Sequence, residues 1–259
     1  MRQCREWIAS HSQPPPRHSA LTKILSPHTL CLDGDIYSDT AKEAIAWADG
    51  LAADRTGRPR LVVRSPGGDA KIAIGLAEKL QRLDAEVTVV DYCMSSCANY
   101  FFAALRRRSV EPGAAILFHG GFSAEDRAET AEMLDQALRD PQMAAHIPDP
   151  VKWRAQQLND FDEEVARQDA LFRRAGVDPL LATGMKGVDE KAIPAARCGG
   201  TEGTKRAMLF FDSKQLRRLG IAVRHGKPLT DPALMGGLLT RFGFRFTACA
   251  VPASYFSAR

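Results

Sequence analysis

Hydrophobic residues recur at two different spacings along the first half of the chain. Short apolar runs at 61–63, 87–90 and 114–118 predict buried strands. Between these runs, apolar residues repeat at helical spacing over 70–83 and over 97–107. Because short strands that alternate with helices pair in parallel through right-handed crossovers, the pattern predicts an α/β fold.

The segment before this unit has a different pattern. Residues 1–27 contain three consecutive prolines and scattered polar residues, which predicts a flexible leader. A short strand at 29–36 is expected to begin the ordered part. Ser38 or Asp39 then caps a predicted helix over 40–53, because serine and aspartate accept hydrogen bonds from the free amides of a first turn.

The second half of the chain is more polar. Residues 123–200 are charged and mostly helical in pattern, which predicts a helical handle or insertion. A strand at 208–211 and a helix at 212–221 then return to the α/β pattern, so we predict one domain over 28–225. The remaining residues, 226–259, are predicted to form a C-terminal tail with a last strand.

The composition is ordinary for a folded chain of 259 residues, with 45% hydrophobic and 25% charged residues. The net charge of +4 is spread along the chain, and the one tight basic cluster, Arg106-Arg107-Arg108, is interpreted as a solvated helix end rather than a nucleic-acid site. No apolar run approaches the ~20 residues of a membrane span. The N-terminus lacks the continuous apolar core of a signal peptide, which favours a cytoplasmic protein, or a periplasmic one if an upstream leader is missing.

The cysteines predict neither a disulfide scaffold nor a metal site. They are few and scattered, at Cys4, Cys31, Cys93, Cys97, Cys198 and Cys249. Cys93 and Cys97, together with His119, are residue types that bind zinc, but a structural zinc site usually has four ligands with tighter pairing. We therefore expect no metal and no cofactor.

Two turns and one histidine at predicted strand ends carry the residue types of acyl-transfer chemistry. Ser95 lies where a buried strand gives way to a helix, whose free N–H groups face any developing anion. The pair Gly67 and Gly68 permits a sharp turn with exposed N–H groups. His119 is the only histidine of the predicted α/β core past residue 28, so it is the best-placed base for a serine nucleophile.

Each of these residues also has a structural interpretation. Ser95 and Ser96 are typical helix-capping residues, because serine hydroxyls bond to nearby backbone groups. A single Pro-Gly-Gly sequence is a common turn, and a histidine at a strand end is more often a satisfied polar residue than a base. The combination of the three features in order along the chain is what favours chemistry.

Three motifs occur in the order and spacing of a known family. They are SPGGD, CMSSCANYFFAA and PGAAILFHGG, with 27 residues from Gly68 to Ser95 and 24 from Ser95 to His119. The run resembles the Clp-type serine proteases, a group within the crotonase-like superfamily that includes the proteolytic subunit of Clp protease and signal peptide peptidase A. It is most similar to Clp-protease-like, periplasmic-type bacterial proteins with a C-x-S-x-C serine turn. The likeness covers 29–121, with a looser likeness at 208–221.

The resemblance implies a fold and a set of roles. The fold would be a crotonase-like, Clp protease-like spiral of repeated β-β-α units with a helical extension. Ser95 matches the nucleophile, His119 the general base, and Gly68 and Ser96 the positions whose backbone N–H groups form the oxyanion hole. The family also implies a homo-oligomer and a separate ATPase unfoldase, since this chain contains no G-x-x-x-x-G-K motif.

The third member of a catalytic triad is not fixed by any motif. The family's acid precedes the late strand, where this chain has Glu202, with Asp189 and Glu190 farther upstream. A Ser–His dyad, or a polar residue such as Thr204 that orients the histidine, are the alternatives.

Three functional hypotheses follow. The first is a serine-type endopeptidase that acts on a peptide or protein substrate, with Ser95 as nucleophile and His119 as base. The second is a catalytically degenerate Clp-like scaffold or binding protein, supported by the missing acid and the unusual cysteine pair. The third is a crotonase-like acyl-CoA enzyme, against which the serine and histidine argue because such enzymes typically use carboxylates.

Overall fold

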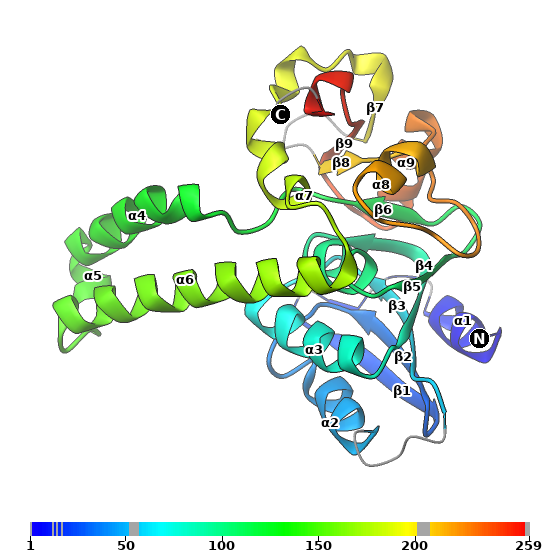
Figure 1. Ribbon diagram of the computed structural model, residues 1–259, viewed down its shortest axis with the longest axis horizontal. Helices are drawn as coiled ribbons and strands as arrows, with labels where there is room; N and C mark the ends of the chain where they lie inside the picture. The colour runs from blue at the N-terminus through cyan, green and yellow to red at the C-terminus, as the bar shows by residue number, and fades with distance from the viewer. Residues whose placement is uncertain are drawn as a thin grey trace.

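The computed structural model describes residues 2–11, 13, 15–16, 18–51, 57–200 and 208–256. Within these residues the protein is mixed α/β, which confirms the predicted fold class (Figure 1). Six strands of the described chain form the main sheet: β1 (Ala20–Ser26), β2 (Thr29–Gly34), β3 (Arg60–Ser65), β4 (Glu86–Met94), β5 (Arg107–Val110) and β6 (Ala115–Leu117).

Parallel pairing determines where the strand ends lie. Strand β1 is antiparallel to β2, whereas β2, β3 and β4 pair in parallel. Strand β4 is the longest of the central strands; β5 pairs with its first half and β6 with its last residues, Tyr92 to Met94. Because parallel strands run in the same direction, the turns after β3, β4 and β6 lie at one edge of the sheet.

Helices cover one face of the main sheet. These are α2 (Lys42–Leu51), α3 (Ala70–Arg82) and the π-helix η1 (Cys97–Phe102) (Figure 1). Helix α3 begins after Asp69, whose carboxylate accepts a hydrogen bond from the backbone N–H of Ile72 at 2.9 Å. Its buried residues repeat at helical spacing and pack into the main core, as the apolar pattern over 70–83 predicts.

Of the helical segment predicted over 123–200, residues 124–175 form a hairpin that extends away from both sheets (Figure 1), whereas the remainder ends in strand β7 of the second sheet. Its helices are α4 (Arg127–Arg139), α5 (Pro141–Ala144) and α6 (Pro150–Ala175), and α4 is preceded by the short helix η2 (Ala124–Asp126). Two ion pairs join α4 to α6, with Arg127 Nε 2.9 Å from Asp162 and Arg154 paired with Asp135. No residue of α4 is buried, so this helix adds surface rather than core, whereas the C-terminal end of α6 buries Leu171 and Phe172 in the main core.

The C-terminal part forms a second, smaller sheet in the order β7-β9-β8. Its strands are β7 (Cys198–Gly200), β8 (Met208–Phe210) and β9 (Thr247–Ala250), and its helices are α7 (Leu180–Thr183), η3 (Gly184–Gly187), η4 (Glu190–Ala192), η5 (Ala195–Arg197), α8 (Ser213–Arg218), α9 (Pro232–Arg241) and η6 (Ala253–Phe256). Phe118 and Leu209 exchange backbone hydrogen bonds of 2.7 and 2.8 Å, which connects this sheet to the residue after β6. Strand β9 lies inside the predicted tail.

The N-terminal residues are ordered where the sequence predicts a flexible leader over 1–27, so that prediction is wrong for the described residues. Helix α1 (Arg2–Ser10) and strand β1 occupy this segment. Cys4 and Ile8 are fully buried against Cys31, Val62 and Val90, on the face of the sheet opposite α2 and α3. The contacts that fix α1 come from residues distant in sequence, so the local pattern does not reveal them.

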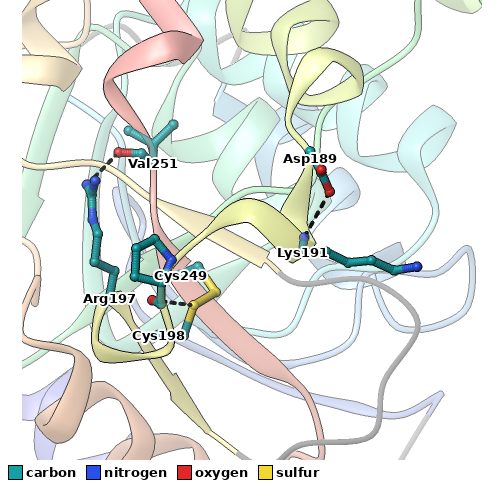
Figure 2. The surroundings of a disulfide bond; sticks show 7 residues. Asp189, Lys191, Arg197, Cys198, Cys249 and Val251 are labelled. Carbon is teal, nitrogen blue, oxygen red and sulfur yellow. Dashed lines mark hydrogen bonds between the residues drawn. A yellow bond between two sulfur atoms is a disulfide. The ribbon is translucent and has the colours of Figure 1, made fainter.

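The cysteines form three disulfides, which corrects the expectation that they build no disulfide framework. The pairs are Cys4–Cys31, Cys93–Cys97 and Cys198–Cys249, with sequence separations of 27, 4 and 51 residues. Figure 2 shows the last of these joining β7 to β9. Spacing along the chain did not indicate the long-range pairs, because the fold brings together residues that no local motif connects.

The basic cluster at 106–108 is not a solvated helix end. The preceding helix ends at Phe102, and Arg108 lies in β5 with 2% of its surface exposed. Its guanidinium donates to the backbone carbonyls of Phe102, at 2.6 Å, and Ala103, so it satisfies carbonyl groups at the end of the π-helix, and it also donates to the carbonyl of Ala222 at 3.3 Å. Burial lowers the pKa of Arg108 to about 10, with a smaller contribution from Arg106.

A buried ion pair connects the first strands of the sheet. Arg64 of β3 donates two hydrogen bonds of 2.8 Å to Asp33 of β2, and the two side chains are 1% and 0% exposed. Arg64 also donates to Asp91 at 3.2 Å and to the backbone carbonyl of His11 at 2.9 Å. Burial acts to lower the pKa of Arg64, but hydrogen bonding to Asp33 and its charge raise it overall.

Among the described residues, no helix combines the length and the apolar character that a membrane crossing requires.

The buried pair predicts a large loss of stability on breaking it. Arg64→Met removes both guanidinium hydrogen bonds from the buried carboxylate of Asp33, and we expect the free energy of unfolding to fall by about 3–5 kcal/mol. The matched control is Arg60→Met on the same strand, whose partner Glu86 is 3.6 Å away and whose side chain is 52% exposed. That change is expected to cost at most about 1 kcal/mol. Urea denaturation of both variants measures the difference, and equal small losses would contradict the prediction.

Candidate active site

Ser95 occupies a sharp turn between β4 and the π-helix η1. Its φ angle is +54°, in the left-handed region that residues other than glycine seldom adopt. The turn is held on both sides, because the N–H of Ser95 donates to the carbonyl of Leu117 at 2.9 Å and its carbonyl accepts from the N–H of Asn99 at 2.9 Å. The backbone therefore fixes the position from which the hydroxyl projects.

The hydroxyl of Ser95 lies against the imidazole of His119. The distance from Ser95 Oγ to His119 Nε2 is 2.5 Å, which is a hydrogen bond. Ser95 follows β4 and His119 follows β6 by two residues, and these strands pair in parallel, so their ends meet at one edge. If Nε2 carries no proton, it accepts the serine hydrogen, which is the arrangement of a nucleophile and its general base.

The glycine turn after β3 lies directly beside Ser95. Gly68 has a φ angle of +149°, and a Cβ atom on it would lie 2.2 Å from the backbone oxygen of Ile36, so only glycine fits. A Cβ on Gly67 would lie 2.7 Å from that of Ser95. The Oγ of Ser96 donates to the carbonyl of Gly68 at 2.8 Å, and this bond ties the two turns together.

The amides of Gly68 and Ser96 are available as donors near the serine. Neither N–H group donates in any hydrogen bond formed within the described part of the chain. Both residues line the same cavity as Ser95 and His119. Two backbone donors beside a nucleophile form the arrangement that stabilises the oxyanion of an acyl-transfer intermediate.

Two buried amide side chains hold the loop that follows His119. Asn99 of η1 donates through Nδ2 to the carbonyl of Gly120 at 2.6 Å. Gln168 of α6, fully buried, accepts from the N–H of Phe122 at 3.0 Å and donates to its carbonyl at 2.8 Å. The hydroxyl of Tyr100 donates to the same Gln168 oxygen at 3.0 Å, and burial raises the pKa of Tyr100.

Sequence reasoning assigned no role to Asn99 or Gln168. Gln168 lies on the apolar face of a predicted helix, beside Phe161 and Phe172. A polar residue in such a position is a signal for a buried hydrogen bond, because an unsatisfied amide is costly inside a protein. Its partner, the backbone of Phe122, is 46 residues away and could not be named from the pattern.

A cavity of about 770 Å³ opens over the serine and histidine. Apart from Ser95, Ser96, His119 and the glycine turn, its described walls include residues of the loop after β6, helices α4 and α6, and the α7–η3 segment: Phe122, Asp126, Glu129, Thr130, Met133, Phe161, Ala182, Met185 and Val188. The cavity is large enough for several side chains of a bound ligand.

The described residues do not single out one of the candidates for the third member of the triad. Glu202 and Thr204 lie outside the described residues. Asp189 uses its carboxylate to accept the backbone N–H of Lys191 at 3.0 Å, and Figure 2 shows that it turns toward this amide. Glu190 begins the short helix η4. The identity of the third member therefore stays a prediction.

A disulfide encloses the serine turn. Cys93 is in β4 and Cys97 is the first residue of η1, so their bond links the two ends of the turn that carries Ser95. Both cysteines are fully buried. Because both are oxidised, neither supplies a thiolate for the zinc site considered from the sequence.

Comparisons with known proteins add no family assignment. No protein-family model matches the sequence, and no curated protein is similar to it at a significant level.

The disulfide predicts that Ser95 depends on oxidised Cys93 and Cys97. The double variant Cys93→Ala/Cys97→Ala removes the covalent link across the turn, so the serine is held less precisely. We expect a fluorophosphonate probe to label it about 10- to 100-fold more slowly than in the native protein.

The matched control is Cys198→Ala/Cys249→Ala, which removes the disulfide between β7 and β9. It is expected to lower thermal stability but to change the labelling rate much less. Circular dichroism verifies that each variant is folded. An equal loss of labelling in both variants would show that the Cys93–Cys97 disulfide has no special role in positioning Ser95.

Proposed function

We propose that the protein is a serine hydrolase, and specifically a peptidase. The observation that carries this proposal is the 2.5 Å contact between Ser95 Oγ and His119 Nε2 on a left-handed turn, next to two available backbone amides. A serine in this backbone conformation is costly unless the surroundings hold it there, and such conformations cluster at active sites.

The proposed reaction proceeds in two steps. His119 takes the proton of Ser95 as the serine oxygen forms a bond to the carbonyl carbon, and the amides of Gly68 and Ser96 stabilise the resulting oxyanion. The C–N bond then breaks, and the imidazolium returns its proton to the leaving amine. Water, deprotonated by the same imidazole, hydrolyses the ester and restores the serine.

We also propose that the fold is of the crotonase-like, Clp protease type. Support comes from the order of its features along the chain. A glycine turn, a serine turn and a histidine follow three strands that pair in parallel, and a helical hairpin comes next. The homo-oligomer and the separate ATPase unfoldase that this resemblance implies stay predictions.

The disulfides support a proposal for the compartment in which the protein works. Three disulfides in one chain are typical of proteins kept in an oxidising environment, and they are rare where thiols are maintained in the reduced state. We therefore propose that the protein acts in an oxidising compartment, as the periplasmic-type alternative from the sequence implies.

The assignment of the nucleophile is tested by fluorophosphonate labelling and peptide mapping. Ser95→Ala and His119→Ala are each expected to lower the labelling rate by at least about 10³-fold. A serine nucleophile and its histidine base act together, so removing either one abolishes most of the rate acceleration that the pair provides. Ser96→Ala keeps its backbone N–H while losing only the hydroxyl that binds Gly68, so labelling of Ser95 should persist at a reduced rate.

Different outcomes distinguish the alternatives. Full labelling of Ser95→Ala would show that another residue is the nucleophile. A native protein that is folded but inert to the probe at neutral and mildly alkaline pH would favour a scaffold without catalysis. Tight binding of an acyl-CoA together with no labelling would favour crotonase-like acyl chemistry.

A further inference from the structure

The wall that α4 contributes to the cavity carries a free negative charge. Glu129, Thr130 and Met133 of this helix line the cavity above Ser95 and His119. Glu129 is exposed, and within the described residues its carboxylate has no ion-pair or hydrogen-bond partner. It faces a cavity that a substrate would fill, so a bound ligand would be its partner.

The other charges of the cavity do not neutralise Glu129. Asp126 is the second acidic residue of the lining, and its Oδ2 accepts the N–H of Ser123 at 3.1 Å in the capping box of η2. The described part of the lining contains no lysine or arginine. The described walls therefore carry acidic but no basic side chains, and such a lining attracts cations because the low-dielectric protein around a cleft concentrates the electrostatic field.

The apolar residues beside Glu129 suit a side chain with a long aliphatic stem. Phe122 and Phe161 make an edge-to-face pair with ring centroids 5.9 Å apart, and both line the cavity. Met133, one helical turn after Glu129, is 55% exposed. Methionine and aromatic surfaces pack against methylene groups, and aromatic faces also attract a cation.

We infer that the site selects peptides with a lysine or arginine close to the cleaved bond, and that Glu129 determines this preference. The inference rests on the proposed peptidase function. The aliphatic stem would pack on Met133, Phe122 and Phe161, and the cationic end would pair with Glu129. An acidic side chain in the same position would be repelled by the carboxylate, so the arrangement discriminates in both directions.

The test uses internally quenched peptides, N-acetylated and C-amidated, so that the introduced residue carries the only charge. Each peptide has lysine, norleucine or glutamate at one position around the cleaved bond; norleucine keeps the stem and removes the ammonium group. At one position we expect kcat/KM for lysine to exceed that for norleucine by about tenfold. Glu129→Gln should abolish this difference, and Glu129→Lys should make glutamate the preferred residue.

The control variant is Glu132→Gln. Glu132 is an exposed residue of the same helix and is not among the described residues that line the cavity. It has the same charge and the same helix environment, so its replacement should leave the lysine preference unchanged. If the lysine preference falls equally in both variants, it arises from the combined electrostatic field of the acidic residues of α4. That result would overturn the role of Glu129.

A binding measurement separates failure of this inference from failure of the proposed function. The affinities of labelled lysine and norleucine peptides for Ser95→Ala are compared by fluorescence anisotropy, with and without Glu129→Gln. If the native protein cleaves no peptide but lysine is bound more tightly through Glu129, the site is selective and the hydrolase proposal fails. Equal affinity for the two peptides, or a preference that survives Glu129→Gln, overturns the inference.

Discussion

Parallel pairing of β3, β4 and β6 is the constraint on which the candidate site depends. The three turns that follow these strands are separated by 24 to 27 residues in sequence, and the shared strand direction brings them to one edge of the sheet. Each turn then depends on a different local feature of its backbone. The first contains two glycines, the second has a serine in the left-handed conformation, and the third is held by hydrogen bonds from buried amide side chains. The sheet brings the three turns close together, and these local features fix the positions of the residues that they carry.

Periodicity along the chain was enough for the central part of the fold. The runs at 61–63 and 87–90 are short, apolar and bounded by turn residues, and they lie in β3 and β4. Ser95 and His119 were also predicted to lie at strand ends, and the structure has them 2.5 Å apart at one edge of the sheet. Such patterns succeed here because the central residues of β3 and β4 are buried on both faces, so they are mostly apolar.

Elsewhere the deciding contacts are distant in sequence, and local patterns could not reveal them. Arg108 looked like a surface charge, but its buried guanidinium donates to carbonyl groups at the end of a π-helix and to the carbonyl of Ala222, which is 114 residues away. Helix α1 is held by burial against strands and by a disulfide to Cys31, neither of which a nine-residue pattern indicates. Gln168 acts on Phe122 across 46 residues. In each case a polar or short segment gains its order from partners that only the folded chain supplies.

The contact between Gln168 and Phe122 also sets how the helical hairpin can vary in length. Gln168 lies near the C-terminal end of α6, and the hairpin tip lies toward the other end (Figure 1). Each residue inserted into α6 before Gln168 rotates the distal hairpin by about 100° relative to the site, whereas one inserted between Gln168 and the helix end turns the amide away from the loop. The register of α6 is thus fixed at its base. Homologous chains are expected to differ in hairpin length through changes toward the tip, with the final turns of α6 kept at constant length.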